Sequence, residues 1–201
     1  MRQVLGYVTL DDRDSGEDEG DDGDGNDRRP ISAQHDVLSL GYPHIRALAM
    51  QDLGLFLLRI IAGVTLAAHG YPKLFGGPGK QAPPLLAKAM GPNYPAAVER
   101  SGPGFAVALE KMGVPNPKAA ATASGLTELV GGLALAAGFF TRPAALAIAF
   151  NMGVATYKAH WKNGFYGQGG YEFSLLLGTV ALSLGLTGPG RLSIDHLISS
   201  K

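Results

Sequence analysis

AAATASGLTELVGGLALAAGFF, residues 119–140, is the stretch of sequence that decides the fold. Nearly all of its side chains are small or apolar, and its one charged residue is Glu128. A helix rises about 1.5 Å per residue, so this segment spans roughly 33 Å, enough to cross the hydrocarbon core of a bilayer. The stretch therefore predicts a transmembrane helix.

Within this stretch Ala120, Ser124, Glu128, Gly132 and Ala136 recur every four residues. That spacing stacks them along one side of a helix, where small side chains let a neighbouring helix approach closely. A charged group at this depth costs about 2.5 kcal/mol or more unless it has partners or faces a wet cavity. Glu128 is therefore expected to face other helices.

Three further apolar segments lie at about residues 53–72, 144–161 and 171–188. The connection between the first two spans contains too much Pro and Gly to cross a membrane, although residues 105–112 fit a short interfacial helix. Pro72 is expected to end the first span, and Ser193 to cap a short C-terminal helix. Residues 51–201 are thus predicted to form an all-α, four-helix transmembrane bundle.

The N-terminal part has a different composition, with ten of the seventeen acidic residues between positions 11 and 27. A run of like charge with many glycines cannot bury enough apolar surface to fold, so residues 1–50 are predicted to be a disordered acidic tail. Two alternatives to a disordered tail stay open. In the first, the tail binds calcium, because DGDGN loosely resembles part of an EF-hand loop. In the second, Met50 is the true start of translation and the tail is a mis-assigned extension. The chain has no cysteine, which excludes disulfides and Cys-ligated iron–sulfur clusters.

Alternating spans bring the ends of spans one and three to the same membrane face as the starts of spans two and four. Proton-handling or quinone-contacting roles are predicted for Glu128, His69, His160 and Glu172, since carboxyl and imidazole groups transfer protons. Lys73, Asn151 and Lys158 are predicted to complete this polar cluster. Alternatively, the lysines snorkel to lipid headgroups, or the two histidines are inert or hold a haem.

Arg59 and Glu128 are the two charges placed deepest in the predicted bundle. Counted from the predicted helix ends, Arg59 lies roughly 20 Å and Glu128 roughly 14 Å below the common face, a gap that an Arg side chain covers. The sequence therefore predicts an Arg59–Glu128 ion pair, which either serves a site or only fixes which helices are neighbours.

The ordered segments LRIIAGVTLAAHGYPKLF, ELVGGLALAAGFFTRPAALAIAFNM, H-x3-GF, YEF and GPGRLSID resemble those of the DoxX family of small integral membrane proteins. The resemblance covers residues 53–198, and the acidic tail and the long connection at 77–101 depart from it. It implies a four-helix membrane protein that is a subunit or partner of membrane oxidoreductases, including thiosulfate:quinone systems. The positions that match the family pattern are Arg59, Gly70, Lys73, Glu128, Gly132, His160 and Glu172.

Taken together, the sequence and the resemblance predict a multi-pass protein of the plasma (inner) membrane. Its expected contacts are the lipid bilayer, a redox-enzyme partner subunit, a second copy of itself and a non-covalently bound quinone. No metal site, covalent cofactor or nucleic-acid partner is expected. Two other functions fit the same residues: a non-catalytic scaffold or assembly protein, and a small transporter with Arg59 and Glu128 on its pathway. The lack of evident internal repeats argues against the transporter.

Overall fold

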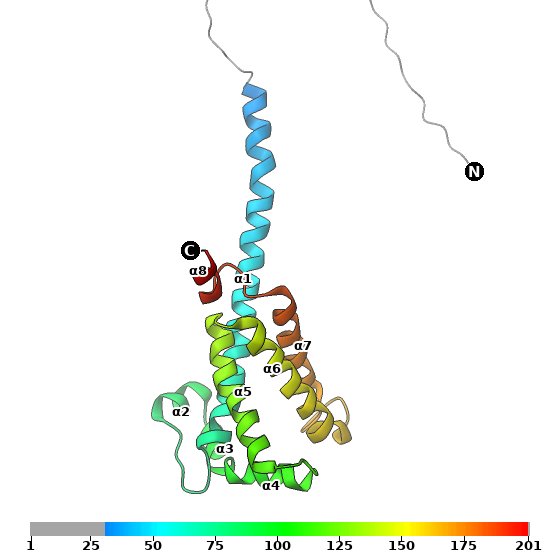
Figure 1. The fold of residues 1–201 in the computed structure, drawn as a ribbon. Coiled ribbons are helices and arrows are strands. Elements are labelled where there is room, and N and C mark those ends of the chain that lie inside the picture. The colour runs from blue at the N-terminus through cyan, green and yellow to red at the C-terminus, as the bar shows by residue number, and fades with distance from the viewer. Residues whose placement is uncertain (1–30, 201) are drawn as a thin grey trace, which may run out of the picture. The chain divides into compact units, whose positions relative to one another are not determined.

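The computed structural model describes the backbone of residues 31–200 and the side chains of residues 48–200, and all regular structure in this part is helical (Figure 1). The chain divides into two compact units, Met1–Gly41 and Tyr42–Lys201, and the hydrophobic core lies in the second. The predicted all-α class is confirmed for the described residues. The helices are α1 (Ile31–Phe75), α2 (Pro84–Met90), α3 (Tyr94–Arg100), α4 (Pro103–Lys111), α5 (Pro117–Ala137), α6 (Thr141–Val154), a π-helix (Ala155–His160), a 3-10 helix (Trp161–Asn163), α7 (Glu172–Thr187) and α8 (Ile194–Ser199).

Helix α1 begins at Ile31, inside the segment that the sequence assigned to a disordered tail. The acidic run lies in residues 1–30, which are outside the described residues, whereas residues 31–50 carry few charges and many apolar side chains. Such a segment can continue an apolar helix in the N-terminal direction. The boundary between tail and membrane domain was predicted at residue 51 because the apolar span begins there, although the acidic run ends earlier in the chain.

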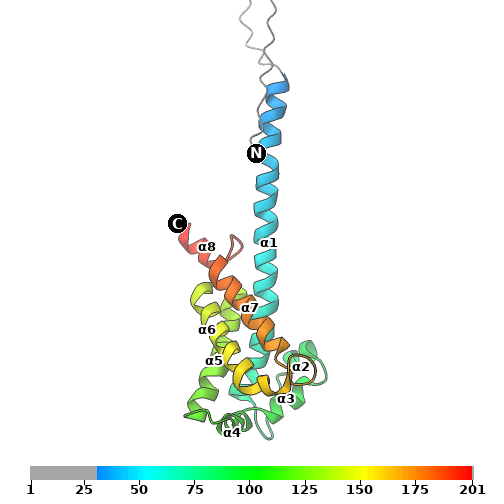
Figure 2. The same ribbon diagram turned by 90° about the vertical axis from the view of Figure 1, so that its right-hand side faces the viewer.

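The four long helices α1, α5, α6 and α7 lie side by side within the second unit (Figures 1 and 2). Their buried side chains form one hydrophobic core, in which Leu66 comes from α1, Leu135 from α5, Ile148 from α6 and Leu184 from α7. The short helices α2, α3 and α4 lie at one end of the four, and α8 lies at the other.

Helices α1 and α5 run antiparallel and touch through backbone atoms. A Cβ atom on Gly132 would lie 2.7 Å from the carbonyl oxygen of Gly63, and one on Gly70 would overlap the backbone of Leu129. The close approach predicted from the small residues of α5 is confirmed, and α1 contributes glycines of its own. These contacts fix the register, because Gly63 faces Gly132 while Gly70 faces Glu128 and Leu129.

Two helical segments, Leu48–Phe75 and Pro117–Ala137, are long and apolar enough to cross a membrane by length and composition. Helix α7 is a shorter apolar helix, and α6 has 14 residues before its π-helical continuation. Large apolar side chains point outward from all four, with Ile61, Leu133, Phe150 and Leu186 among the most exposed. The first two predicted spans thus meet the criteria for crossing a bilayer, and spans three and four stay predictions.

The last turn of α1 contains Pro72, where the sequence predicted the helix to end. Proline has no N–H to donate to the carbonyl four residues earlier, which here belongs to Ala68. The hydroxyl of Tyr94 in α3 donates to this carbonyl instead, at 3.1 Å. The helix continues to Phe75, so the predicted end at Pro72 is wrong, because a distant side chain satisfies the acceptor that proline leaves free.

The C-terminal segment joins the turn between α5 and α6 to the bundle. The carboxylate of Asp195 accepts hydrogen bonds from the backbone N–H groups of Phe140 (2.8 Å) and Thr141 (2.9 Å). Phe140 has a φ of 47°, a left-handed conformation that bulky side chains rarely adopt, so this turn needs such support. The predicted cap of α8 is confirmed, since Ser193 Oγ accepts from the N–H of His196 at 3.1 Å.

Asp195 should make the stability of this end depend on pH. Burial alone would raise the pKa of Asp195, but the hydrogen bonds from Thr141 and Phe140 and the charge of Arg59 hold this pKa below its usual value. Ionised Asp195 therefore stabilises the fold above its unfolded-state pKa of about 3.9, and this stabilisation is lost as the pH falls through the lower folded-state value.

We expect Asp195→Ala to lower the free energy of unfolding by about 1–2 kcal/mol at pH 7, as when a helix cap is removed. The difference from the wild type should narrow as the pH falls below about 4. Thermal unfolding followed by circular dichroism across this range measures both effects, with the exposed Ser199→Ala as the control. A difference that does not change with pH would contradict the role of the ionised carboxylate.

Candidate functional site

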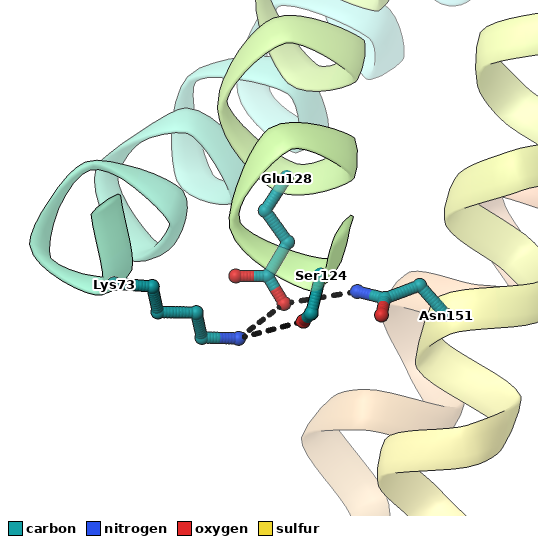
Figure 3. Close-up of polar contacts among 4 residues, drawn as sticks. All are labelled: Lys73, Ser124, Glu128 and Asn151. Atoms are coloured by element: carbon teal, nitrogen blue, oxygen red, sulfur yellow. Dashed lines mark hydrogen bonds and ion pairs between the residues drawn. The ribbon is translucent and has the colours of Figure 1, made fainter. Parts of the chain in front are cut away.

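A buried ion pair between α1 and α5 is the centre of the candidate site. Glu128 is 2% exposed and lies in the middle of α5, while Lys73 lies in the last turn of α1. Lys73 Nζ is 2.6 Å from Glu128 Oε1 (Figure 3). The lysine side chain is 20% exposed, so the pair is buried on the carboxylate side and more open on the ammonium side.

Two more polar groups complete this cluster. Asn151 of α6 donates from Nδ2 to Glu128 Oε1 at 3.1 Å, and Lys73 Nζ donates to Ser124 Oγ at 3.4 Å (Figure 3). Three helices thus meet at one carboxylate oxygen. The other oxygen, Oε2, is buried and has no hydrogen-bond partner among the described residues. Glu128 therefore has an unused acceptor position in surroundings where an unsatisfied polar atom is costly.

The predicted Arg59–Glu128 ion pair is wrong. Helix α1 continues past Pro72 to Phe75, so Arg59 lies farther from the end of this helix than predicted. The antiparallel register of α1 and α5 places Glu128 opposite Gly70. Arg59 precedes Gly70 by eleven residues, a rise of roughly 16 Å, which is longer than an Arg side chain. Lys73 is one turn from Gly70 and reaches Glu128 in place of Arg59.

Arg59 lies at the opposite end of the bundle, where it is fully buried. Its Nη2 donates to the carbonyl oxygen of Leu192, and its guanidinium packs against Gly138, at which a Cβ atom would collide with it. Nε and Nη1 have no hydrogen-bond partner among the described residues. Arg59 therefore holds the C-terminal segment against α1 and is not part of the Glu128 cluster.

An inner cavity of about 390 Å³ opens beside the Lys73–Glu128 pair. Helices α1, α5, α6 and α7 and the π-helix form its walls, together with Phe105 and Leu109 of α4 and Met112 directly after this helix. The ammonium of Lys73 lies 4.5 Å from the centre of the Phe105 ring. Most of the lining is apolar, and its polar members are His69, Lys73, Ser124, Glu128, Asn151, Lys158, His160 and Ser174.

The two histidines at this cavity have different surroundings. His69 of α1 packs against Phe173 of α7, with 5.7 Å between the ring centres. His160 ends the π-helix, and its Nδ1 is 2.9 Å from the carbonyl oxygen of Gly169 in the following loop. The backbone bond fixes the orientation of His160, whereas His69 is held by packing.

Glu172 does not belong to this cavity. It begins α7, and its carboxylate faces the preceding loop, where Oε1 accepts from the N–H of Gly167 at 3.5 Å. The expectation that the histidines and Glu172 share one pocket is therefore wrong for Glu172. Alternating connectivity brings these residues to the same end of the bundle, but it does not fix the direction of a side chain in the first turn of a helix.

Several features of the site had no clear signal in the sequence. The 105–112 segment was predicted to be interfacial, but its role as a wall of the cavity depends on tertiary packing. The π-helix was not expected, and its buried Thr156 is linked to Ser174 of α7 by a hydrogen bond of 2.8 Å. Single-turn π-helices often occur at functional sites. Ser124 could have been identified from its place one turn before Glu128.

The cavity can hold a small ring molecule that carries polar groups, because its lining combines polar side chains with apolar walls. Lys73 offers donors, Glu128 and the histidines can accept or release protons, and the apolar wall excludes water. Among the residues that the structure describes, no group of three or more His, Asp or Glu side chains is placed to hold a metal ion. The polar side chains that line the cavity can donate and accept hydrogen bonds.

Comparison with known proteins gives one match. The model of a family described as DoxX matches residues 54–161, from the first apolar span to the end of the π-helix and the first residue of the 3-10 helix. The matched region contains Lys73, Ser124, Glu128, Asn151 and His160. No curated protein and no solved structure matches the chain.

Proposed function

The chain belongs to the DoxX family and is a membrane protein, and from this premise we propose that it is a multi-pass subunit or partner of a quinone-linked oxidoreductase of the plasma membrane. The observation that supports this function is the inner cavity, which combines apolar walls with the Lys73–Glu128–Asn151 cluster. A quinone needs both features, because the carbon atoms of its ring are apolar while the two carbonyl oxygens on that ring accept hydrogen bonds.

In this function Lys73 donates a hydrogen bond to one carbonyl oxygen of the quinone. Reduction of a quinone to a quinol takes up two electrons and two protons. We assign the proton transfer to Glu128 and His69, the two groups that line the cavity next to Lys73. We place the source of electrons on a partner protein, with thiosulfate as the electron donor that the family resemblance implies.

Quinone binding is the first test of this function. Trp161 is the single tryptophan of the chain and directly follows His160, which lines the cavity, so its fluorescence is a suitable probe for binding there. We expect a water-soluble benzoquinone to quench this fluorescence with a saturable concentration dependence in the purified full-length protein. Quenching that rises linearly with the quinone concentration would indicate collisions without binding. That result would favour the non-catalytic scaffold function over the quinone function.

Proton transfer is tested with two glutamate variants. Glu128→Gln keeps the side-chain volume and an acceptor for Asn151, so the protein should still fold and bind the quinone. We expect its quinol formation in membranes supplied with thiosulfate to fall about 100-fold or more, the usual effect of removing a general acid or base. Glu172→Gln is the matched control, because Glu172 lies outside the cavity, and it should retain activity within twofold. Full activity of Glu128→Gln would remove Glu128 from the chemistry.

A further inference from the structure

A second cavity lies on the other side of the Lys73 side chain. This outer groove has a volume of about 400 Å³ and lies between α1 and the short helices α2 and α3. It shares His69, Lys73 and Phe105 with the inner cavity, so these three side chains form the wall between the two spaces. Its remaining lining is uncharged and includes Thr65, Ala68, Pro72, Met90, Tyr94 and Ala97.

The floor of the outer groove suits a hydrocarbon chain. Thr65, Ala68 and Pro72 follow one another at spacings of three and four residues, which places them on one face of α1. The carbonyl of Ala68, which Pro72 leaves without its usual donor, accepts from the hydroxyl of Tyr94. The groove therefore presents small side chains and no unsatisfied carbonyl at this position.

The inner cavity holds a ring but not a long chain. At about 390 Å³ it lies near the lower end of the size range of pockets that enclose a small molecule. Its polar groups gather at the Lys73–Glu128 pair, next to the wall that it shares with the outer groove. A ring whose polar groups bind at this pair would lie next to the outer groove, separated from it by Lys73 and Phe105.

We propose that the site takes a quinone with a long apolar tail, whose ring lies in the inner cavity and whose tail passes between Lys73 and Phe105 into the outer groove. This inference rests on the proposed quinone function and adds the route that the tail of the quinone takes. The contact of the Lys73 ammonium with the Phe105 ring at 4.5 Å is the part of the wall that the tail replaces. Phe105 lies in the first turn of α4, next to Gly102, which has a φ of 67°.

The test compares a benzoquinone without a tail and the same ring with a decyl tail, in the full-length protein and two variants. Ala97→Phe fills the outer groove, whereas Ala96→Phe places the same side chain on the exposed side of α3. Phenylalanine leaves Trp161 as the single tryptophan, so fluorescence quenching measures binding in all three proteins. Partition of the tail into detergent is the same for each protein and cancels when the ratios of affinity are compared.

In the wild type and in Ala96→Phe we expect the tail to raise affinity tenfold or more. In Ala97→Phe this gain should fall below threefold, while the quinone without a tail binds as it does to the wild type. That unchanged binding also shows that the variant is folded. If Ala97→Phe keeps the full gain, the tail lies elsewhere and this inference is wrong while the quinone function stands. If the ring without a tail fails to bind to the wild type, the quinone function itself is wrong.

Discussion

Gly63→Ala is expected to separate α1 from α5 and to lower strongly both the stability and the yield of the folded protein. A Cβ atom at this position would overlap the carbonyl oxygen of Gly132 and lie 2.7 Å from the backbone nitrogen of Ala136. Overpacking commonly costs about 1–3 kcal/mol, and we expect about 3 kcal/mol or more here, because backbone atoms cannot rotate away as a side chain can.

Gly54→Ala is the matched control, since Gly54 lies in the same helix and a Cβ atom there would have nothing within 4 Å. Thermal unfolding of the two purified variants, together with their yield from membranes, measures the effect. Equal stability of the two variants would mean that α1 and α5 are not in backbone contact at Gly63.

Lys73→Met is expected to have the next largest effect, because it leaves the buried carboxylate of Glu128 without its cation. Removal of one partner from a buried ion pair costs about 3–5 kcal/mol. We expect a loss of about 3 kcal/mol in the free energy of unfolding, at the lower end of this range, because a carboxyl group, unlike a guanidinium, can become neutral. Urea or thermal unfolding in detergent measures this loss.

The double variant Lys73→Met/Glu128→Leu should be more stable than Lys73→Met alone, because no unpaired charge is then buried. The losses from Arg59→Met and Glu128→Leu should in contrast add, since these residues lie at opposite ends of the bundle. Additive losses from Lys73 and Glu128, or coupling between Arg59 and Glu128, would contradict the pairing in the structure.

The sequence predicted which faces of the helices point inward, because hydrophobic burial and the cost of a charge in an apolar interior act on each residue locally. Arg59 and Lys73 were predicted to face other helices, Arg59 in an ion pair and Lys73 in the polar cluster, and both side chains point into the bundle. The small residues around Glu128 likewise indicated a close helix contact, and Gly63 and Gly70 lie against them.

Which residues meet across two helices could not be predicted in the same way. The partner of Glu128 depends on how far α1 continues, and that depends on the hydrogen bond from Tyr94 to the carbonyl that Pro72 leaves free. A shift of a few residues in this register would move Lys73 out of reach of Glu128. The support of the α5–α6 turn by Asp195 joins residues more than fifty positions apart, and no local pattern indicates it.

The ion pair of Lys73 and Glu128 also determines how the site responds to an electric field. Moving one elementary charge across a membrane corresponds to about 2.3 kcal/mol per 100 mV, but a pair of opposite charges at the same depth has no net charge on which the field can act. A substitution that removes one of the two charges, such as Lys73→Met, leaves a net charge at that depth. In an energised membrane the site of such a variant should therefore respond to the voltage, whereas the intact pair does not.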